Sequence, residues 1–292
     1  MKVTGFSFIK DAILYDYPIA ESIRSILPIC DEFVVAVGKS SDNTIDLIKE
    51  IDKEKIRIIE TVWDESLREG GQVLATETDK AFHNISKDSD WAFYIQGDEV
   101  IHEKYLNVIY NNMTRFKDER KIDGLLFKYL HFYGSYDYVG TSSKWYRNEI
   151  RVIKNTSSIY SYKDAQGFRK GNNEKLSVYP INAYIYHYGW VKEPKAMQRK
   201  QESFNKLWHD DKWVESHILK ADEFDYSLNV SHLRKFSGQH PEVMKKRIEL
   251  KNWKFDHDIS INRKALKDKA KDLLRDYIGI DIGYKNYKIA KL

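Results

Sequence analysis

The first 62 residues alternate between short apolar runs and segments with helical spacing. Lys2–Ile9 predicts a first strand, Phe33–Val37 a second strand whose wholly apolar run indicates burial on both faces, and Ile56–Val62 a third. Between them, apolar residues recur every three or four positions after Pro18 and again over Ile45–Ile51, which predicts two helices. This strand–helix–strand–helix–strand order favours a parallel sheet with right-handed crossovers, and a nucleotide pocket is the usual function of such a half.

Near residue 95, a short aromatic run is followed at once by polar residues. Trp91–Ile95 has the length and composition of a buried central strand, and it is followed by Gln96, Gly97, Asp98 and Glu99. Ligands of an open α/β sheet bind beyond the carboxyl ends of its strands, where a glycine admits a ligand to the backbone and adjacent carboxylates can take a hard cation. We therefore expect a binding site here. The alternative is a strand-to-helix turn whose acids favour the helix N-terminus.

The rest of the apolar pattern predicts further elements around this centre. The predicted strands are Gly124–Tyr133, Arg147–Ile153 and Ile181–His187, and the predicted helices are Val73–Phe82, His102–Phe116, Pro194–Trp208, Trp213–Lys220, Pro241–Glu249 and Asn262–Tyr277. Gly134–Lys144 and Tyr160–Arg169 are predicted as loops. The first is rich in aromatic residues, which suits a sugar with apolar faces, and packing over the core explains it equally well.

A double glycine stands ahead of the predicted Val73–Phe82 helix. Gly70 and Gly71 would expose backbone N–H groups that can meet a phosphate, and Arg68 is near enough to assist. A simple capping turn is the alternative.

Cysteine usage and the length of the apolar runs indicate where the protein works. The single cysteine, Cys30, lies in an apolar stretch, which predicts a buried thiol and no disulfide framework. The N-terminus lacks the apolar core of a signal peptide, and no run approaches the ~18 apolar residues that cross a bilayer. We expect a soluble protein of a reducing, cytoplasmic compartment.

Basic residues are concentrated at the C-terminal end of the chain. Residues 231–292 hold 16 Lys and Arg against 8 Asp and Glu, although the whole chain has a net charge of only +4. A solvated helix face explains this excess, and the alternative is peripheral contact with an anionic membrane at its inner face, or with phosphate groups. The sequence holds no nucleic-acid-binding motif, so no nucleic-acid partner is expected.

Three motifs in this order resemble the nucleotide-sugar glycosyltransferases of family 2, which have the GT-A fold. G-K-S-S-D-N-T, residues 38–44, resembles the D-D-G-S-T-D-G-T motif of the family, and Q-G-D-E, residues 96–99, resembles its D-x-D-E element. E-G-G-Q-V-L-A, residues 69–75, resembles the segment that lines the nucleotide side of the site. The resemblance covers about residues 1–190, and implies a mostly parallel central sheet flanked by helices in a catalytic domain of residues 1–192, with a helical extension over residues 193–292.

The resemblance also assigns roles to individual residues. It places Asp98 on a divalent cation, Mn²⁺ or Mg²⁺, with His187, at the end of a late strand, as a further ligand or a packed core histidine. Glu99, Trp145 and Gln166 are expected on the acceptor side. The donor is expected to contact Ile9, Lys10, Gly38, Lys39, Asp42, Arg68, Gly70, Gly71, Gln96 and Gly97.

The chain departs from the family pattern at two places. Val37 and Gly38 stand where the family often has acids that hold the uracil or ribose. Gln96 replaces the first Asp of D-x-D and carries no charge, so the metal would rest mainly on Asp98.

An inverting sugar transfer also needs a base for the acceptor hydroxyl. Asp164, in the predicted Tyr160–Arg169 loop, is the first candidate. Glu149 is the second, and its position in a strand between Arg147 and Arg151 makes a structural ion pair an equal interpretation.

The sequence thus predicts a metal-dependent, inverting glycosyltransferase with a nucleoside-diphosphate-sugar donor and a carbohydrate or glycolipid acceptor, in cell-surface polysaccharide or glycolipid synthesis. Two alternatives come from other classes. A sugar-nucleotide nucleotidyltransferase shares the sheet, but its Gly-rich basic loop after the first strand is replaced here by F-I-K-D-A, residues 8–12. A non-catalytic nucleotide- or carbohydrate-binding protein would keep the aromatics without needing the paired acids.

Overall fold

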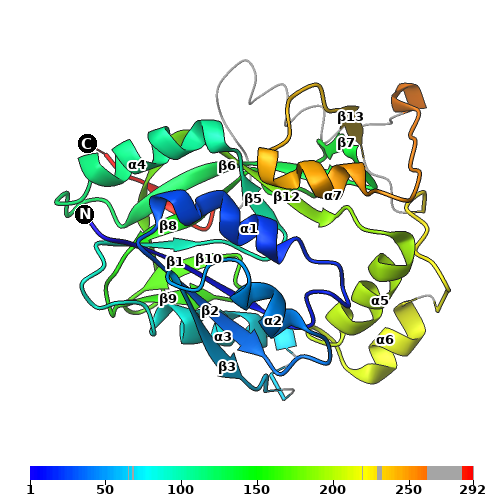
Figure 1. Cartoon of the computed structure of the whole chain (residues 1–292), viewed down its shortest axis with the longest axis horizontal. Helices are drawn as coiled ribbons and strands as arrows, with labels where there is room; N and C mark the ends of the chain where they lie inside the picture. Colours follow the sequence, from blue (N-terminus) through cyan, green and yellow to red (C-terminus); the bar gives the residue numbers. More distant parts are fainter. Residues whose placement is uncertain (65, 68, 219, 229–231, 262–284, 292) are drawn as a thin grey trace.

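A twisted central sheet organises the protein, which is described here from a computed structural model covering residues 1–64, 66–67, 69–218, 220–228, 232–261 and 285–291. Within these ranges, eleven strands form the central sheet and three more form a small separate sheet. Helices cover both faces of the central sheet (Figure 1). The predicted α/β class, with a mostly parallel central sheet flanked by helices, is confirmed.

The N-terminal half of the sheet is parallel, as the alternation of strands and helices predicts. β4 (Trp91–Tyr94), β1 (Val3–Ile9), β2 (Glu32–Gly38) and β3 (Ile56–Thr61) lie side by side in that order, and each pair is parallel. The crossovers contain α1 (Ile19–Ile26), α2 (Thr44–Lys49) and α3 (Gln72–Phe82).

Strand β2 shows why its sequence is apolar throughout. Phe33, Val35 and Val37 pack into the core that contains the apolar face of α1, whereas Val34 and Ala36 pack into the core under α3. Because successive side chains of a strand point to opposite faces, a strand covered on both sides needs apolar residues at every position.

The second half of the sheet mixes directions. β8 (Asn148–Lys154) is antiparallel to both β4 and β6 (Gly124–Tyr133), and β12 (Ser177–Trp190) is parallel to β6. α4 (Leu106–Arg115) packs against β12. The shorter strands are β7 (Ser135–Gly140), β13 (Leu233–Lys235) and β14 (Lys288–Ile289) in the central sheet, and β9 (Ile159–Tyr162), β10 (Gly167–Lys170) and β11 (Glu174–Lys175) in the small sheet.

Two local predictions were wrong, and one short strand was missed. Strand β5 (Glu99–Ile101) precedes the helix predicted from His102, because Val100 and Ile101 are buried and pair with β12. The predicted loop 134–144 contains β7, since Gly134, at φ 72°, turns the chain back along β6. The predicted loop 160–169 is a hairpin of β9 and β10, and only its tip is a turn.

The last third of the chain begins with two helices, α5 (Pro194–Asn205) and α6 (Asp211–His217), and later contains α7 (Lys245–Glu249). Short 3₁₀ helices occur at Leu27–Ile29, Glu69–Gly71, Glu103–Tyr105, Glu242–Met244 and Ile259–Ile261. The predicted helix Asn262–Tyr277 lies outside the described residues, and the division at residue 192 stays a prediction. Among the described residues, no helix is both long enough and apolar enough to cross a membrane.

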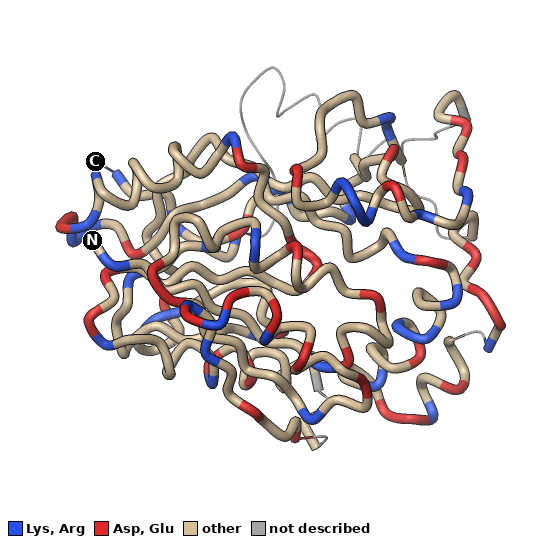
Figure 2. The backbone as a smooth tube through the Cα atoms, viewed as in Figure 1, with Lys and Arg blue, Asp and Glu red and all other residues tan. Residues whose placement is uncertain are grey.

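The basic residues of α7 stand close together (Figure 2). One of them, Arg247, is not free for a partner, because it is ion-paired with Asp16 and with Glu21 of α1. These pairs fix α7 to the N-terminal half of the protein.

Candidate active site

A cavity of about 480 Å³ opens at the carboxyl ends of β1 and β4. Residues that follow β1 form one wall, the turn after β4 forms the floor, and α5 with the segment after it closes the far side. This is the edge of an α/β sheet where ligands bind, and the volume lies in the usual range for small-molecule sites. Both aromatic and charged side chains line it.

The structure brings eight of the residues predicted for the site to the wall of this cavity. They are Ile9, Lys10, Gln96, Gly97, Asp98, Asp164, Gln166 and His187. The glycine at 97 is required by close packing, because a Cβ there would lie 2.8 Å from Cδ1 of Ile9.

Other predicted residues do not line the cavity. Lys39 is exposed, and Asp42 ties two loops together by accepting the backbone N–H groups of Leu14 and Thr44 at 2.7 and 3.0 Å. Gly38 and Gly71 make room for indole rings, since a Cβ at each would lie 2.4 Å from Nε1 of Trp63 and 3.1 Å from the ring of Trp208.

Gly70 and Gly71 both adopt positive φ at the start of α3, and Gly70 has open space around it. Trp145 stacks on His131 behind the cavity wall. Arg68 lies outside the described residues.

Glu99 and Arg151 form a fully buried ion pair beneath the cavity floor. Nε and Nη2 of Arg151 donate to the two carboxylate oxygens of Glu99 at 2.8 and 2.7 Å, and the hydroxyl of Tyr129 donates to Glu99 at 2.7 Å. The backbone N–H of Gln96 also donates to Glu99, at 3.2 Å. Glu99 therefore holds the turn that carries Asp98, and it does not face the cavity.

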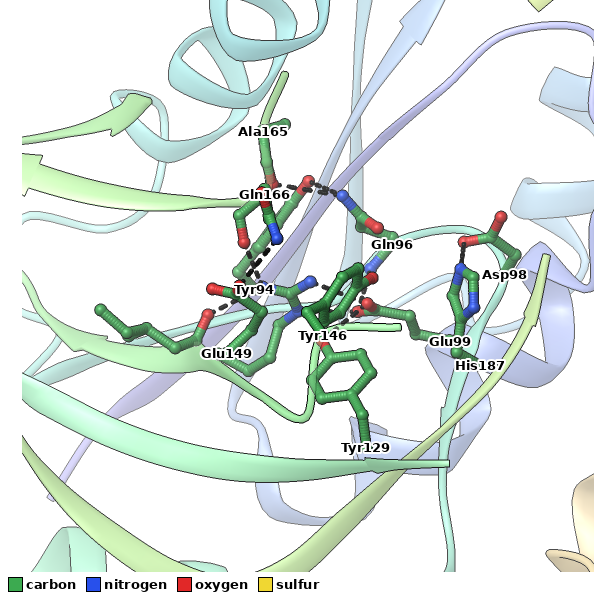
Figure 3. Close-up of polar contacts among 12 residues, drawn as sticks. Tyr94, Gln96, Asp98, Glu99, Tyr129, Tyr146, Glu149, Ala165, Gln166 and His187 are labelled. Atoms are coloured by element: carbon green, nitrogen blue, oxygen red, sulfur yellow. Dashed lines mark hydrogen bonds and ion pairs between the residues drawn. The ribbon is translucent and has the colours of Figure 1, made fainter. Parts of the chain in front are cut away.

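The same arginine reaches the other side of the site. Nη1 of Arg151 donates to the carbonyl oxygen of Gln166 at 3.0 Å, and Nε2 of Gln96 donates to the carbonyl oxygen of Ala165 at 3.2 Å. Figure 3 shows these contacts between the turn after β4 and the tip of the β9–β10 hairpin. The turn and the hairpin are thus fixed to one another. The structural ion pair considered for Glu149 is instead made by Glu99.

Asp98 is a buried carboxylate between the imidazole of His187 and the ammonium of Lys200. Its Oδ1 lies 3.7 Å from Nε2 of His187, and its Oδ2 lies 3.4 Å from Nζ of Lys200 (Figure 3 shows the contact with His187). Burial alone would raise the pKa of Asp98. The interactions of the carboxylate with His187, Lys200 and Lys192 outweigh burial and lower its pKa to about 2.

Hydrogen bonds of a second histidine assign the tautomer of His187. Nε2 of His131 lies 2.7 Å from the carbonyl oxygen of Tyr146, which can only accept, so this nitrogen carries hydrogen. His131 is buried among aromatic rings, and burial holds its pKa well below the usual range, so its Nδ1 is a bare acceptor. Nδ1 of His187, 3.0 Å away, therefore donates to it, and the lone pair of His187 Nε2 faces Asp98.

This donor set fits a divalent cation that takes most of its ligands from a substrate. Burial lowers the pKa of His187, which favours its neutral form, and in that form a carboxylate oxygen and an imidazole lone pair face each other across 3.7 Å. Such an ion is commonly bound by one or two protein side chains plus phosphate oxygens. Among the described residues, no group of three His, Cys, Asp or Glu side chains could hold a metal, so these two would need a ligand's oxygens to complete the shell.

Asp164 lies at the tip of the β9–β10 hairpin, on the cavity wall. Its neighbours Lys163 and Ala165 have φ of 56° and 62°, a tight turn that presents the Asp164 side chain to the cavity. Burial raises the pKa of this carboxyl above its usual value. The group can therefore accept a proton from a bound hydroxyl.

Glu149 lies one layer behind this wall. Its Oε1 accepts a hydrogen bond from Nε2 of Gln166 at 2.9 Å, and its Oε2 is buried without a partner. Burial, together with the charges of Glu99 and Asp164, raises the pKa of Glu149 to about 8, although Arg151 opposes the shift. Glu149 supports Gln166 and does not line the cavity.

Sequence reasoning missed several residues of the site, and three of them bear directly on its chemistry. Lys200 reaches Asp98 from α5, Trp190 lines the cavity at the end of β12, and His131 fixes His187 from the adjacent strand. Only Trp190 had a local signal, the aromatic run at the end of the predicted strand. The other two contact residues that are 102 and 56 positions away in the sequence.

The Glu99–Arg151 pair predicts a non-additive pair of substitutions. Glu99→Gln and Arg151→Met should each lower the free energy of unfolding by about 3–5 kcal/mol, because each leaves a buried charge without a partner. The free energy of unfolding of the double variant should fall by clearly less than the sum of the two single losses. Urea denaturation measures all three. The exposed pair Lys195–Glu223 is the control, where single substitutions should cost less than about 1 kcal/mol. Additive losses at Glu99 and Arg151 would contradict the account.

The raised pKa of Glu149 predicts a pH dependence of stability. The unfolded carboxyl has a pKa of about 4.5, and the folded one about 8, so the folded protein binds the extra proton between these values. The free energy of unfolding of the wild type should therefore fall, relative to Glu149→Gln, by up to about 1.4 kcal/mol per pH unit as pH rises through this window. Denaturation at pH 5, 6, 7 and 8 tests this. Parallel profiles of the two proteins would show that Glu149 ionises normally.

Comparisons with known proteins find no close relative. No known family profile matches the sequence, and no curated protein matches it. Among solved structures, the chain is similar to S. aureus TarS 1–349, with a TM-score of 0.40 and 14% identity, covering 70% of this chain and 64% of that chain, which is less than two thirds of its length. The complex of the same protein with UDP matches with a TM-score of 0.41 over 76% of this chain and 68% of that chain, also at 14% identity.

Two further matches are weaker. Glucosyl-3-phosphoglycerate synthase from Mycobacterium tuberculosis, in complex with Mn²⁺, UDP and phosphoglyceric acid, has a TM-score of 0.30 at 17% identity, over 44% of this chain and 43% of that chain. The 4-diphosphocytidyl-2C-methyl-D-erythritol synthase from Anaerococcus prevotii has a TM-score of 0.36 at 12% identity, over 65% of this chain and 91% of that chain. Because these TM-scores are below 0.5, we base the proposed function on the geometry of this chain's own cavity.

Proposed function

We propose that the protein is a glycosyltransferase that moves a sugar from a nucleoside diphosphate to a hydroxyl acceptor, with inversion at the sugar carbon and with a divalent cation. One observation carries the proposal. A single cavity holds both an ionised carboxylate facing an imidazole lone pair, Asp98 and His187, and a partly buried carboxylate able to accept a proton, Asp164. Sugar transfer from a diphosphate needs these two functions on either side of the reacting carbon.

The nucleoside end of the donor would lie near the residues that follow β1. Phe8, Lys10 and Trp63 line the cavity there, and the ammonium of Lys10 lies 5.7 Å from the centre of the Trp63 ring. An aromatic face next to a cation suits a base followed by phosphates. Gln96 and Gly97 line the floor of the cavity, over which the ribose would lie.

The diphosphate would lie over Asp98 and His187. These two residues would hold Mn²⁺ or Mg²⁺, which supplies positive charge to the leaving diphosphate when it is bound. His131 orients the His187 ring for this contact, and the Glu99–Arg151 pair holds the backbone of the turn.

Asp164 would act as the base. In the proposed step, its carboxylate takes the proton of the acceptor hydroxyl, and the oxygen forms a bond to the sugar carbon. The bond from this carbon to the diphosphate oxygen breaks at the same time, and the diphosphate leaves with the electron pair. The raised pKa of Asp164 suits a base that works near neutral pH.

The acceptor would enter past Tyr146 and Trp190, which both line the cavity, and the centre of the Tyr146 ring lies 6.4 Å from that of His187. Ring faces of this kind pack against the apolar faces of a sugar. We propose a carbohydrate or glycolipid as the acceptor, as in cell-surface polysaccharide or glycolipid synthesis on the cytoplasmic side.

We also propose that the chain is divided into a catalytic domain, residues 1–192, and an extension, residues 193–292. The basic segment 231–292 would contact the membrane.

The proposal is tested by incubating the protein with Mn²⁺ and a panel of nucleoside-diphosphate sugars, and measuring release of the nucleoside diphosphate. We expect slow hydrolysis of one donor, which chelation of the metal abolishes. Release of pyrophosphate from a nucleoside triphosphate and a sugar phosphate would instead identify a nucleotidyltransferase. Nucleotide binding without turnover of any donor would identify a binding protein.

Substitution of Asp98 by Asn should abolish metal-dependent turnover. The amide keeps the size of the side chain but lacks the charge that holds the cation, so we expect a loss of at least 100-fold in kcat and no effect of Mn²⁺ on nucleotide affinity. Circular dichroism and thermal unfolding check that the variant is folded. Metal-dependent turnover at the wild-type rate would reject this role.

Substitution of Asp164 by Asn should slow transfer and leave donor binding intact. Loss of a general base typically costs about 10²–10⁴-fold in rate. Steady-state kinetics should therefore show a fall in kcat with a donor KM within about twofold of wild type. Glu149→Gln, one layer behind, should affect kcat far less. If donor affinity collapses instead, Asp164 belongs to the nucleotide pocket.

A further inference from the structure

Lys200 is a buried lysine whose ammonium contacts the proposed metal-binding carboxylate. It lies on α5, and its Nζ is 3.4 Å from Oδ2 of Asp98 and donates to the carbonyl oxygen of Gly189 at 3.0 Å. The ammonium also lies near the rings of Tyr17 and Phe204, whose centres are 5.0 and 5.7 Å away. A buried ammonium is costly without an anionic partner, so Asp98 holds Lys200 in this position.

The two oxygens of Asp98 thus face two different cation positions. Oδ1 faces the lone pair of His187 Nε2, and Oδ2 faces the ammonium of Lys200. A divalent ion next to Oδ1 would lie within a few ångströms of the ammonium, and two cations at such a distance repel strongly in a buried site. The ion and Lys200 therefore compete for the same carboxylate.

Lys200 can move away from Asp98 without its charge being left unpaired, provided that the cavity holds another anion. It lines the cavity, so its flexible four-carbon stem can move the ammonium toward whatever anion the cavity holds. Lys192 differs in this respect. It is also buried, but it does not line the cavity, and its Nζ donates to the carbonyl oxygen of Asp16 at 2.6 Å.

We propose that Lys200 is a tethered cation that occupies Asp98 in the free protein, yields this carboxylate to the divalent ion when a nucleoside diphosphate enters, and then contacts the diphosphate. The inference rests on the proposed function. It makes the metal and the nucleotide bind synergistically. The metal alone must displace Lys200 from Asp98, and the nucleotide alone binds while Lys200 is still held by Asp98. When both are bound, the ion contacts Asp98 and Lys200 contacts the phosphate oxygens. By linkage, the nucleotide strengthens metal binding as much as the metal strengthens nucleotide binding.

Binding of Mn²⁺, followed by the electron paramagnetic resonance of the free ion, tests the proposal. The titration is done with the full chain in the absence of nucleotide and with each of UDP, GDP and CDP. In the wild type, we expect weak binding of Mn²⁺ alone and binding at least tenfold tighter with one of the diphosphates.

Lys200→Met should bind Mn²⁺ alone about tenfold more tightly than the wild type, because the competing charge is gone. At saturating Mn²⁺, its affinity for the diphosphate should fall about tenfold. Lys200→Arg keeps the charge and should keep Mn²⁺ binding as weak as in the wild type. Lys195→Met, an exposed position of the same helix, is the matched control and should behave as the wild type.

Unchanged or weaker Mn²⁺ binding by Lys200→Met in the absence of nucleotide would overturn the proposal, and Lys200→Gln repeats the measurement if the Met variant is unfolded. This titration with Mn²⁺ alone needs no nucleotide, so its result does not depend on whether the proposed function is correct. If no nucleoside diphosphate binds the wild type, the proposed function and the diphosphate contact both fail, whatever the result with Mn²⁺ alone.

Discussion

The buried ion pair between Glu99 and Arg151 is the contact on which the geometry of the site depends. Glu99 fixes the turn that carries Asp98, and Arg151 fixes the hairpin that carries Asp164, so one pair sets the position of both working carboxylates. Neither charge can be removed alone without leaving its partner buried and unpaired. The pair is shielded from water by the rings of Tyr94 and Tyr129, whose centres lie 5.1 and 5.4 Å from the guanidinium.

Above this pair, the chemistry of the cavity follows from the balance of charge around Asp98. Lys200 and Lys192 keep the carboxylate ionised, and the hydrogen-bond chain from the Tyr146 carbonyl through His131 leaves a lone pair on His187. The carboxylate of Asp98 therefore attracts a cation, which is either the ammonium of Lys200 or a metal ion bound together with phosphates. Asp164 lies farther along the wall, and its pKa shifts in the opposite direction, because burial raises it more than the charges of Lys163 and Arg151 lower it.

The sequence predicted most strands and helices because their periodicity is local. The parallel half of the sheet and the polar turn after β4 follow from runs of five to eight residues, and the turn contains Asp98 as expected. The prediction missed β5 and was wrong at β7, because these short strands are stabilised by pairing with distant partners. Glu99 with Arg151, His131 with His187 and Asp98 with Lys200 could not be predicted, because each pair is brought together only by the tertiary fold, across 52, 56 and 102 positions.

The most direct measurement of the central claim is a crystal structure with Mn²⁺ and the nucleoside diphosphate that binds most tightly, with anomalous scattering used to locate the metal. The account predicts an anomalous peak between Oδ1 of Asp98 and Nε2 of His187, with the diphosphate against it and the nucleoside toward Trp63. A nucleotide bound outside this cavity, or manganese bound away from both Asp98 and His187, would contradict it.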